Sequence, residues 1–212
     1  MPRDPVPSRA GVQAPVDGEL WAEIQPESSR RILLAALDAF SSLGYHASTT
    51  RGIAQRVGLS PAALYVHYAS KSELLYEMSR IGHTAVLREV RAATSDGKPA
   101  ERLPAMVAAF TLWHAVNHDL ARVIYDEREE LTPERLGELQ AIQRDLEELF
   151  HAELRRGVDT GDFIVDDPQA TVWALLSLGI DVARWWPRAG VEPEALADAY
   201  ARIALRICGV AG

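Results

Sequence analysis

Apolar residues recur at intervals of three and four positions through most of the chain, which is the period of amphipathic helices. The first clear case covers about 28–43, where a stripe of apolar side chains faces inward: Ile32, Leu33, Ala36, Leu37 and Phe40. Alternation of β-branched and polar residues, which would indicate strands, never lasts more than a few positions. The pattern therefore predicts an all-α protein.

Residues that begin and end helices divide this pattern into separate elements. A hydroxyl at the N-cap position marks a helix start, and a glycine after the last turn marks a helix end. Such signals stand at Gly44, Thr49, Gly58, Ser60 and Ser70. The helices expected after the first cover about 50–57, 61–67, 71–93, 100–117, 119–130, 133–157, 167–186 and 193–208.

Three regions follow from this division. Residues 1–26 hold five of the twelve prolines and are predicted to be a disordered arm. Within this arm Leu20, Trp21 and Ile24 are expected to form one short ordered patch. Residues 27–75 form a compact set of three helices followed by the start of a fourth, and residues 76–212 form a larger helical domain.

Charge is distributed unevenly along the chain. The net charge is −8, yet residues 27–82 carry six basic and four acidic side chains. A basic N-terminal region followed by an acidic remainder is typical of a protein whose N-terminal region binds a polyanion. An excess of only two basic residues can also arise by chance. Arg3 and Arg9 could carry the arm into a minor groove, but the arm's four acidic residues favour plain disorder.

The composition excludes several classes of protein. The single cysteine, Cys208, excludes a disulfide framework. No apolar run is long enough for a membrane span, and the first residues hold no apolar signal core. We therefore expect a cytoplasmic protein without a membrane partner.

Two short helices joined by a tight turn at Gly58-Leu59-Ser60 are typical of a helix-turn-helix. Glycine permits the backbone that the turn needs, and Leu59 can anchor the turn in the core. Such a unit lays its second helix, here about 61–67, into the DNA major groove.

These residues resemble the DNA-binding domain of the TetR family of transcription regulators. The resemblance rests on Gly44-Tyr45, Thr49, Ile53-Ala54, Val57-Gly58-Leu59-Ser60, Leu64-Tyr65, His67-Tyr68, Lys71 and Leu74-Leu75. It implies a three-helix DNA-binding domain at 27–75 that binds a double-stranded operator. It also implies a larger domain at 76–212 for ligand binding and dimerisation. Thr50 and Gly52 depart from the family pattern, which usually has an apolar and an acidic residue there.

The DNA-binding residues expected from chemistry and from the resemblance lie near the ends of the two short helices. Hydroxyls and backbone N–H groups at a helix start suit phosphates, and an alanine methyl suits a thymine methyl. The residues are Thr49, Arg51, Ser60, Ala62, Ala63, Tyr65, His67 and Lys71. Core packing is the alternative for Tyr65 and the preferred interpretation for Tyr68. The role of His67 stays open, and Lys71 could be a plain surface lysine.

The resemblance implies a homodimer through the last two helices, about 167–186 and 193–208. Both offer more apolar surface than one core contact uses, which suits a four-helix interface between two chains. The alternative is a buried core within one chain.

The middle helices are expected to enclose a small-molecule effector in a mainly apolar cavity. The ligand-binding residues predicted are Phe110, Trp113, His114, Asn117, Arg122, Tyr125, Phe150, Trp173 and Arg184. The C-terminal half resembles the actinobacterial TetR-type repressors of fatty-acid and steroid-ring catabolism, whose effectors are CoA thioesters. Arg122, Arg128, Arg184 and Arg188, with Trp185 and Trp186, could hold such a ligand, or the arginines could be surface ion pairs. A hydrophobic drug or cation is the alternative effector.

Enzymatic and metal chemistry find little support in the sequence. His114 and His118 lie four apart and could share a metal or supply a catalytic base, but no third ligand stands nearby. No phosphate-binding glycine loop or nucleophile elbow is present. We therefore expect no enzyme, no metal and no cofactor, but a repressor released by its effector.

Overall fold

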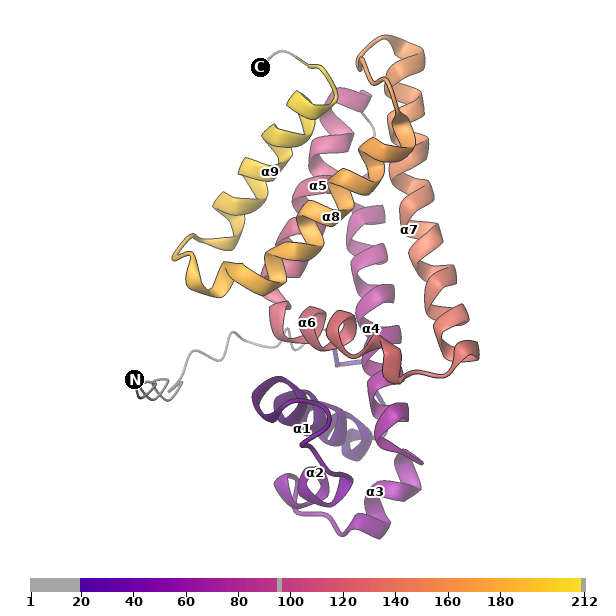
Figure 1. Ribbon diagram of the computed structural model, residues 1–212, viewed down its shortest axis with the longest axis vertical. Coiled ribbons are helices and arrows are strands. Elements are labelled where there is room, and N and C mark those ends of the chain that lie inside the picture. Colours follow the sequence, from indigo (N-terminus) through magenta and orange to yellow (C-terminus); the bar gives the residue numbers. More distant parts are fainter. Residues whose placement is uncertain (1–19, 95–96, 211–212) are drawn as a thin grey trace, which may run out of the picture.

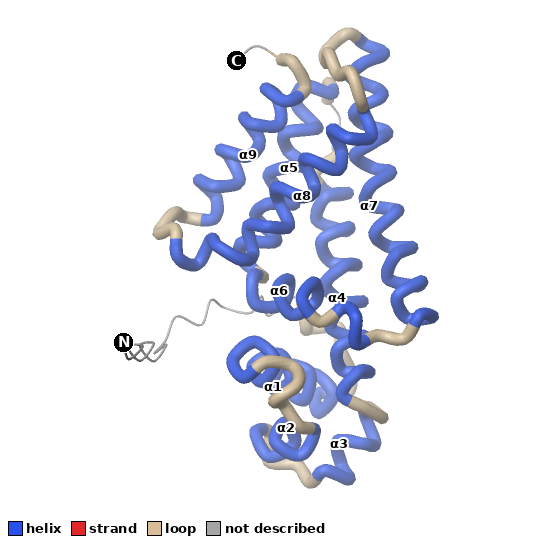
Figure 2. The backbone as a smooth tube through the Cα atoms, viewed as in Figure 1, coloured by secondary structure: helices blue, strands red, loops and turns tan. Residues whose placement is uncertain are grey.

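The computed structural model describes residues 20–94 and 97–210, and it builds them from helices joined by short loops (Figures 1 and 2). Among these residues there is no strand, so the all-α prediction is confirmed. The helices are α1 Glu27–Leu43, α2 Thr50–Arg56, α3 Pro61–His67, α4 Lys71–Ala92, α5 Pro99–Val116, α6 His118–Asp126, α7 Pro133–Thr160, α8 Pro168–Trp185 and α9 Pro193–Ile207. The helix expected at 119–130 ends at Asp126, and a short 3₁₀ turn, η1 (Arg128–Glu130), follows it.

The N-terminal unit of α1, α2 and α3 is held by local caps. The Thr49 hydroxyl accepts from the Gly52 N–H at 3.1 Å, so the unusual glycine still completes the cap. The Ser60 hydroxyl accepts from the Ala63 N–H, also at 3.1 Å. Gly58 has φ of +70°, a backbone that other residues rarely adopt, and it makes the turn between α2 and α3.

Helix α4 runs from the N-terminal unit into the larger domain (Figure 1). The Ser70 hydroxyl accepts from the Glu73 N–H at 3.0 Å. Ser70 and Glu73 have the spacing of a capping box, but the Glu73 carboxylate accepts from the Ala69 N–H, one residue before the usual donor. Because α4 packs against α1 and also against α5, α6 and α7, it connects the two domains.

Helix α5 lies at the centre of the larger domain and contacts α4, α7, α8 and α9. The approach of α8 is close because Gly179 has no side chain, and a Cβ atom there would overlap the Phe110 ring. Both α8 and α9 pack on α5 with one face and leave the other exposed.

The segment before α1 differs from the disordered arm that composition predicts. Trp21 is only 1% exposed and lies among Leu37 of α1 and Asn117 and Leu120 at the α5–α6 corner. Leu20 and Ile24 pack against the same core, which confirms the short ordered patch. The remainder of the predicted arm, with Arg3 and Arg9, lies outside the described residues.

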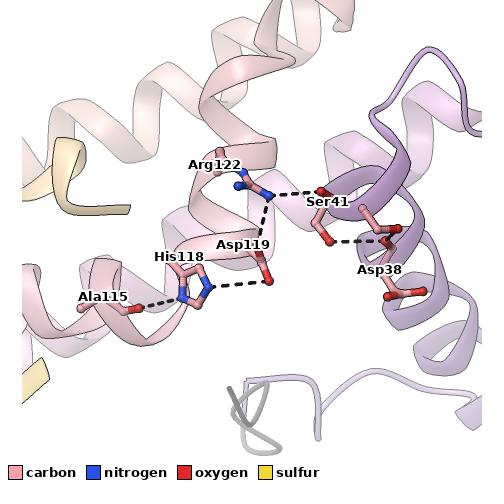
Figure 3. A network of polar contacts seen from close by, with 7 residues as sticks. Asp38, Ser41, Ala115, His118, Asp119 and Arg122 are labelled. Atoms are coloured by element: carbon pink, nitrogen blue, oxygen red, sulfur yellow. Dashed lines mark hydrogen bonds and ion pairs between the residues drawn. The ribbon is translucent and has the colours of Figure 1, made fainter. Parts of the chain in front are cut away.

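A polar contact joins the two domains where α1 meets α6 (Figure 3). The Arg122 guanidinium donates to the Ser41 backbone oxygen at 3.1 Å and to the Asp119 carboxylate at 3.2 Å. His118, one turn earlier, donates from Nδ1 to the Ala115 backbone oxygen at 3.0 Å. Arg122 thus holds the end of α1 against the larger domain.

Candidate DNA interface and effector cavity

One end of the molecule presents the starts of α2 and α3 together with the exposed side of α3 (Figure 1). The exposed residues there are Thr49, Arg51, Ser60, Ala62 and Tyr65, while Ala63 is half-buried. The Tyr65 hydroxyl lies 2.9 Å from the Thr50 hydroxyl, and the side chain is 51% exposed. Tyr65 is therefore a surface residue whose hydroxyl is shared with Thr50, and it can still meet a phosphate.

His67 and Lys71, two further residues of the predicted DNA set, are held by the protein itself. The two ring nitrogens of His67 lie 3.0 Å from the hydroxyls of Ser28 and Ser29, which ties the end of α3 to α1. The Lys71 ammonium donates to the backbone oxygens of Tyr45 at 2.7 Å and Ser48 at 3.2 Å. An ammonium has three N–H groups, so Lys71 retains one donor for a phosphate.

Tyr68 packs in the core, as preferred from the sequence. Its hydroxyl donates to the Ser29 backbone oxygen at 3.3 Å, and burial raises its pKa to about 12. It does not face the surface that carries Tyr65.

A cavity of about 310 Å³ lies in the larger domain between α4, α5, α7 and α8, with Tyr125 and Arg128 at one end. Its apolar wall consists of Val86, Phe110, Ile142, Leu146, Trp173, Leu176 and Ile180. Of the predicted ligand residues, Phe110, Tyr125 and Trp173 line it directly. His114 contacts Phe110 and Tyr125 from behind, and the ring of Phe150 lies 6.0 Å from that of Phe110.

The other predicted ligand residues lie elsewhere. Trp113 and Asn117 line a separate cavity of about 210 Å³, which Leu20 also lines. Arg122 belongs to the contact between the domains, and Arg184 forms an exposed ion pair with Asp126 at 2.9 Å. The structure therefore does not bring Arg122 or Arg184 to the cavity of Tyr125.

Polar residues that were not predicted as ligand residues also line this cavity, namely His83, Gln143, Glu147 and Ser177. His83 donates from Nδ1 to the Ser79 backbone oxygen at 2.7 Å, so its Nε2 is the acceptor for the Gln143 amide, also at 2.7 Å. His83 shares the inward face of α4 with Ser79 and Val86, a spacing that could have indicated it. Arg128, which the sequence offers as a cation for CoA, lies at the same cavity.

His114 is bound in the same way as His83. Its Nδ1 donates to the Phe110 backbone oxygen at 2.8 Å, and its Nε2 lies 3.4 Å from the Tyr125 hydroxyl. Burial lowers the pKa of both histidines, that of His114 to about 4. Both rings are therefore neutral at pH 7, and each offers a fixed acceptor.

Arg128 is the cation at the mouth of the cavity. Its side chain is exposed, and it forms no ion pair within residues 20–94 and 97–210. Its charge contributes to lowering the pKa of His83 and opposes the rise that burial causes in the pKa of Tyr125. A ligand in this cavity would therefore have apolar walls around it and a guanidinium at the rim.

Both halves of the chain match known families. Residues 32–78 match the bacterial regulatory proteins of the tetR family, and residues 96–208 match the tetracyclin repressor-like C-terminal domain. This chain belongs to the TetR family. It is accordingly a DNA-binding transcription regulator and not an enzyme, so neither His114 nor His118 is a catalytic base.

Individual relatives agree with this assignment. The chain is 30% identical to the transcriptional repressor KstR2 of Rhodococcus jostii, with 84% of this chain and 91% of the repressor covered. It is 28% identical to the transcriptional activator FasR of Mycolicibacterium smegmatis, with 84% and 81% covered. A crystal structure of a tetR-family regulatory protein from Rhodococcus RHA1 is 38% identical, with a TM-score of 0.86 over 89% of this chain and all of that chain.

A more distant structure shares the fold. AibR, solved in complex with isovaleryl coenzyme A and operator DNA, is 21% identical, with a TM-score of 0.75 over 82% of this chain and 96% of that chain.

No helix in the described parts of our chain is long and apolar enough to cross a membrane.

Proposed function

We propose that this chain is a homodimeric repressor that binds a pseudo-palindromic operator and releases it when an effector fills the cavity beside Tyr125. The observation that carries the proposal is the position of α4. This helix lines the cavity through His83 and Val86, and it begins four residues after the end of α3. A ligand that displaces α4 would change the spacing of the two α3 helices in a dimer, and so operator affinity.

The exposed faces of α8 and α9 are the dimer interface in this proposal. Leu178 on α8 is 40% exposed, and Ile203 and Ile207 on α9 are each 38% exposed. They lie on helices whose opposite faces pack on α5. Covering them with a second copy would remove apolar surface from water, as a stable dimer requires.

An acyl-CoA or a steroid-derived CoA thioester is the proposed effector. The cavity volume is at the lower end for small-molecule sites, so it suits the acyl part while the CoA lies outside. Arg128 at the rim can bind a phosphate. The relatives support this class: AibR was solved with isovaleryl coenzyme A, and a neighbour from Mycobacterium tuberculosis is described as a ketosteroid regulator.

One observation favours a second candidate, a hydrophobic cation. Glu147 also lines the cavity, and a carboxylate there could pair with a positively charged drug. Arg128 and Glu147 therefore point to opposite ligand charges, and the two candidates can be separated by changing each residue in turn.

A thermal-shift screen tests both candidates. The full chain is heated with acyl- and steroid-acid CoA thioesters, the matching free acids, CoA alone and cationic dyes. A ligand at about 100 times its Kd adds about 2.7 kcal/mol, which raises Tm by roughly 5 to 10 °C. Stabilisation by a thioester alone, lost in Arg128→Ala and kept in the control Arg144→Ala, supports the CoA effector. Stabilisation by dyes alone, lost in Glu147→Gln, contradicts it and supports the cation.

A further inference from the structure

The outward face of α3 is apolar. Leu64 is fully buried, and successive residues of a helix are separated by about 100°, so the opposite face is centred on Ala62 and Val66. These two residues are four apart and therefore neighbours on the surface. Val66 is 81% exposed, and Ala62 is exposed as well. Nothing within the described chain covers this pair.

The polar groups near this pair are already engaged within the domain. The Tyr65 hydroxyl is bonded to the Thr50 hydroxyl of α2 at 2.9 Å. The His67 ring is held between Ser28 and Ser29. The face of α3 that enters a major groove therefore offers methyl groups and no side chain that can bind a base edge through two hydrogen bonds.

The chemistry of the major groove limits what such a face can recognise. Base edges there present hydrogen-bond donors and acceptors, and the one apolar feature is the C5-methyl group of thymine. A methyl group set against a donor or acceptor leaves that polar group without its partner, which costs free energy. Val66 is β-branched and stiff about its first side-chain torsion, so little freedom is lost when it contacts a thymine.

We infer that Ala62 and Val66 read thymine methyl groups at the centre of each operator half-site, with Val66 making the stronger contact. The inference rests on the proposed binding of an operator through α3. It adds a residue, Val66, to the DNA-binding set and a chemical rule for the sequence that is bound. Hydrogen-bonded readout of neighbouring bases then falls to exposed residues on other elements, such as Arg51.

Removing methyl groups from the DNA tests the inference directly. A duplex is first selected by the full chain from a randomised pool, and each dT of both half-sites is then replaced by dU. Burial of one methyl group corresponds to about a fourfold change in affinity. We expect one or two dT positions per half-site to show this loss. Replacing one such dT in each half-site together should weaken binding about sixteenfold. Replacement by dC should weaken binding further, and 5-methyl-dC should recover part of that loss.

A variant assigns the contact to Val66. Val66→Ala should bind the dT duplex more weakly and be insensitive to dU at one of those positions. Val191→Ala, which changes another exposed valine outside the DNA-binding unit, should behave as the parent protein. Circular dichroism confirms that each variant is folded.

The outcomes separate the inference from the function on which it rests. If no duplex is selected over bulk DNA, operator binding and methyl readout both fail. If a specific duplex is bound but every dU replacement is neutral, methyl readout alone is wrong. A dU penalty that stays unchanged in Val66→Ala overturns the role given to Val66.

Discussion

The DNA-binding unit and the effector cavity follow different rules of construction. In the unit, α2 and α3 have seven residues each, and each is capped by a hydroxyl that bonds three residues ahead. The cavity takes its walls from α4, α5, α7 and α8, whose contributing residues are up to 97 positions apart, from His83 to Ile180. The first region is fixed by local chemistry and the second by the packing of distant helices, so substitutions should affect them differently.

The largest expected contrast is between two buried leucines. Leu64 is fully buried in the unit, whereas Leu176 borders the cavity, where room already exists. We expect Leu64→Ala to lower the free energy of unfolding by about 4 kcal/mol and Leu176→Ala by about 2 kcal/mol. The loss is smaller for Leu176 because its side chain already borders empty space and makes fewer packing contacts that can be lost. Urea denaturation followed by circular dichroism measures both. Equal losses would show that the cavity wall is packed as tightly as the unit.

Acid should weaken the cavity region through His114. Burial lowers its pKa to about 4 in the folded protein, below the unfolded value of 6.5. Between pH 6.5 and pH 4, His114 therefore binds a proton in the unfolded chain but stays neutral in the folded chain. Stability is full above pH 6.5 and falls as the pH drops toward 4, by about 3 kcal/mol at most.

The variant His114→Gln isolates this effect. It keeps hydrogen-bonding groups near Phe110 and Tyr125 but cannot titrate. Its free energy of unfolding should change less over the same pH interval than that of the parent protein, with a remainder from His83, whose pKa is also lowered. Parallel curves for the two proteins would refute the titration of His114.

A smaller loss is expected from breaking one hydrogen bond at the cavity. Gln143→Leu leaves the buried Nε2 acceptor of His83 without its donor, at a cost of about 1 to 3 kcal/mol. The exposed neighbour Gln140 provides the control Gln140→Leu. Thermal unfolding of the two variants compares them, and a Tm for Gln143→Leu equal to that of the control would mean that water replaces the amide.

The smallest effect concerns Arg184. Its ion pair with Asp126 joins two exposed side chains, so Arg184→Ala should cost less than about 1 kcal/mol. Because Arg184 does not line the cavity of Tyr125, the effector-induced rise in Tm should be unchanged. A lost thermal shift in this variant would return Arg184 to the ligand site expected from the sequence.

The same contrast explains what the sequence could predict. The caps at Thr49 and Ser60 and the turn at Gly58 depend on residues a few positions apart. The predicted bounds of α2 and α3 therefore agree with the observed bounds to within one residue. Cavity residues depend on which side of a helix meets its neighbours. Phe110 and Tyr125 were expected at the cavity and lie there. Trp113 lies three residues after Phe110, on a neighbouring part of the same helix face, yet it lines a separate cavity.

Long polar side chains were the hardest to place. Several arginines were candidates for one ligand, and only packing shows that Arg128 reaches the cavity while Arg122 reaches back to α1. Trp21 was easier to place, because its apolar neighbours Leu20 and Ile24 predicted a short ordered patch. It lies in a proline-rich stretch whose composition indicates disorder, yet it fills a site formed by α1 and the α5–α6 corner.

The bond from Arg122 to the Ser41 backbone has a consequence for how such a regulator can evolve (Figure 3). The arginine touches neither the proposed DNA surface nor the cavity, and its partner is a backbone oxygen that any residue at position 41 supplies. A substitution of Arg122 can therefore alter how strongly the two domains are joined, while the operator and the effector that are recognised stay the same. Evolution can thus change the effector concentration at which the regulator responds without changing the effector or the operator that it recognises.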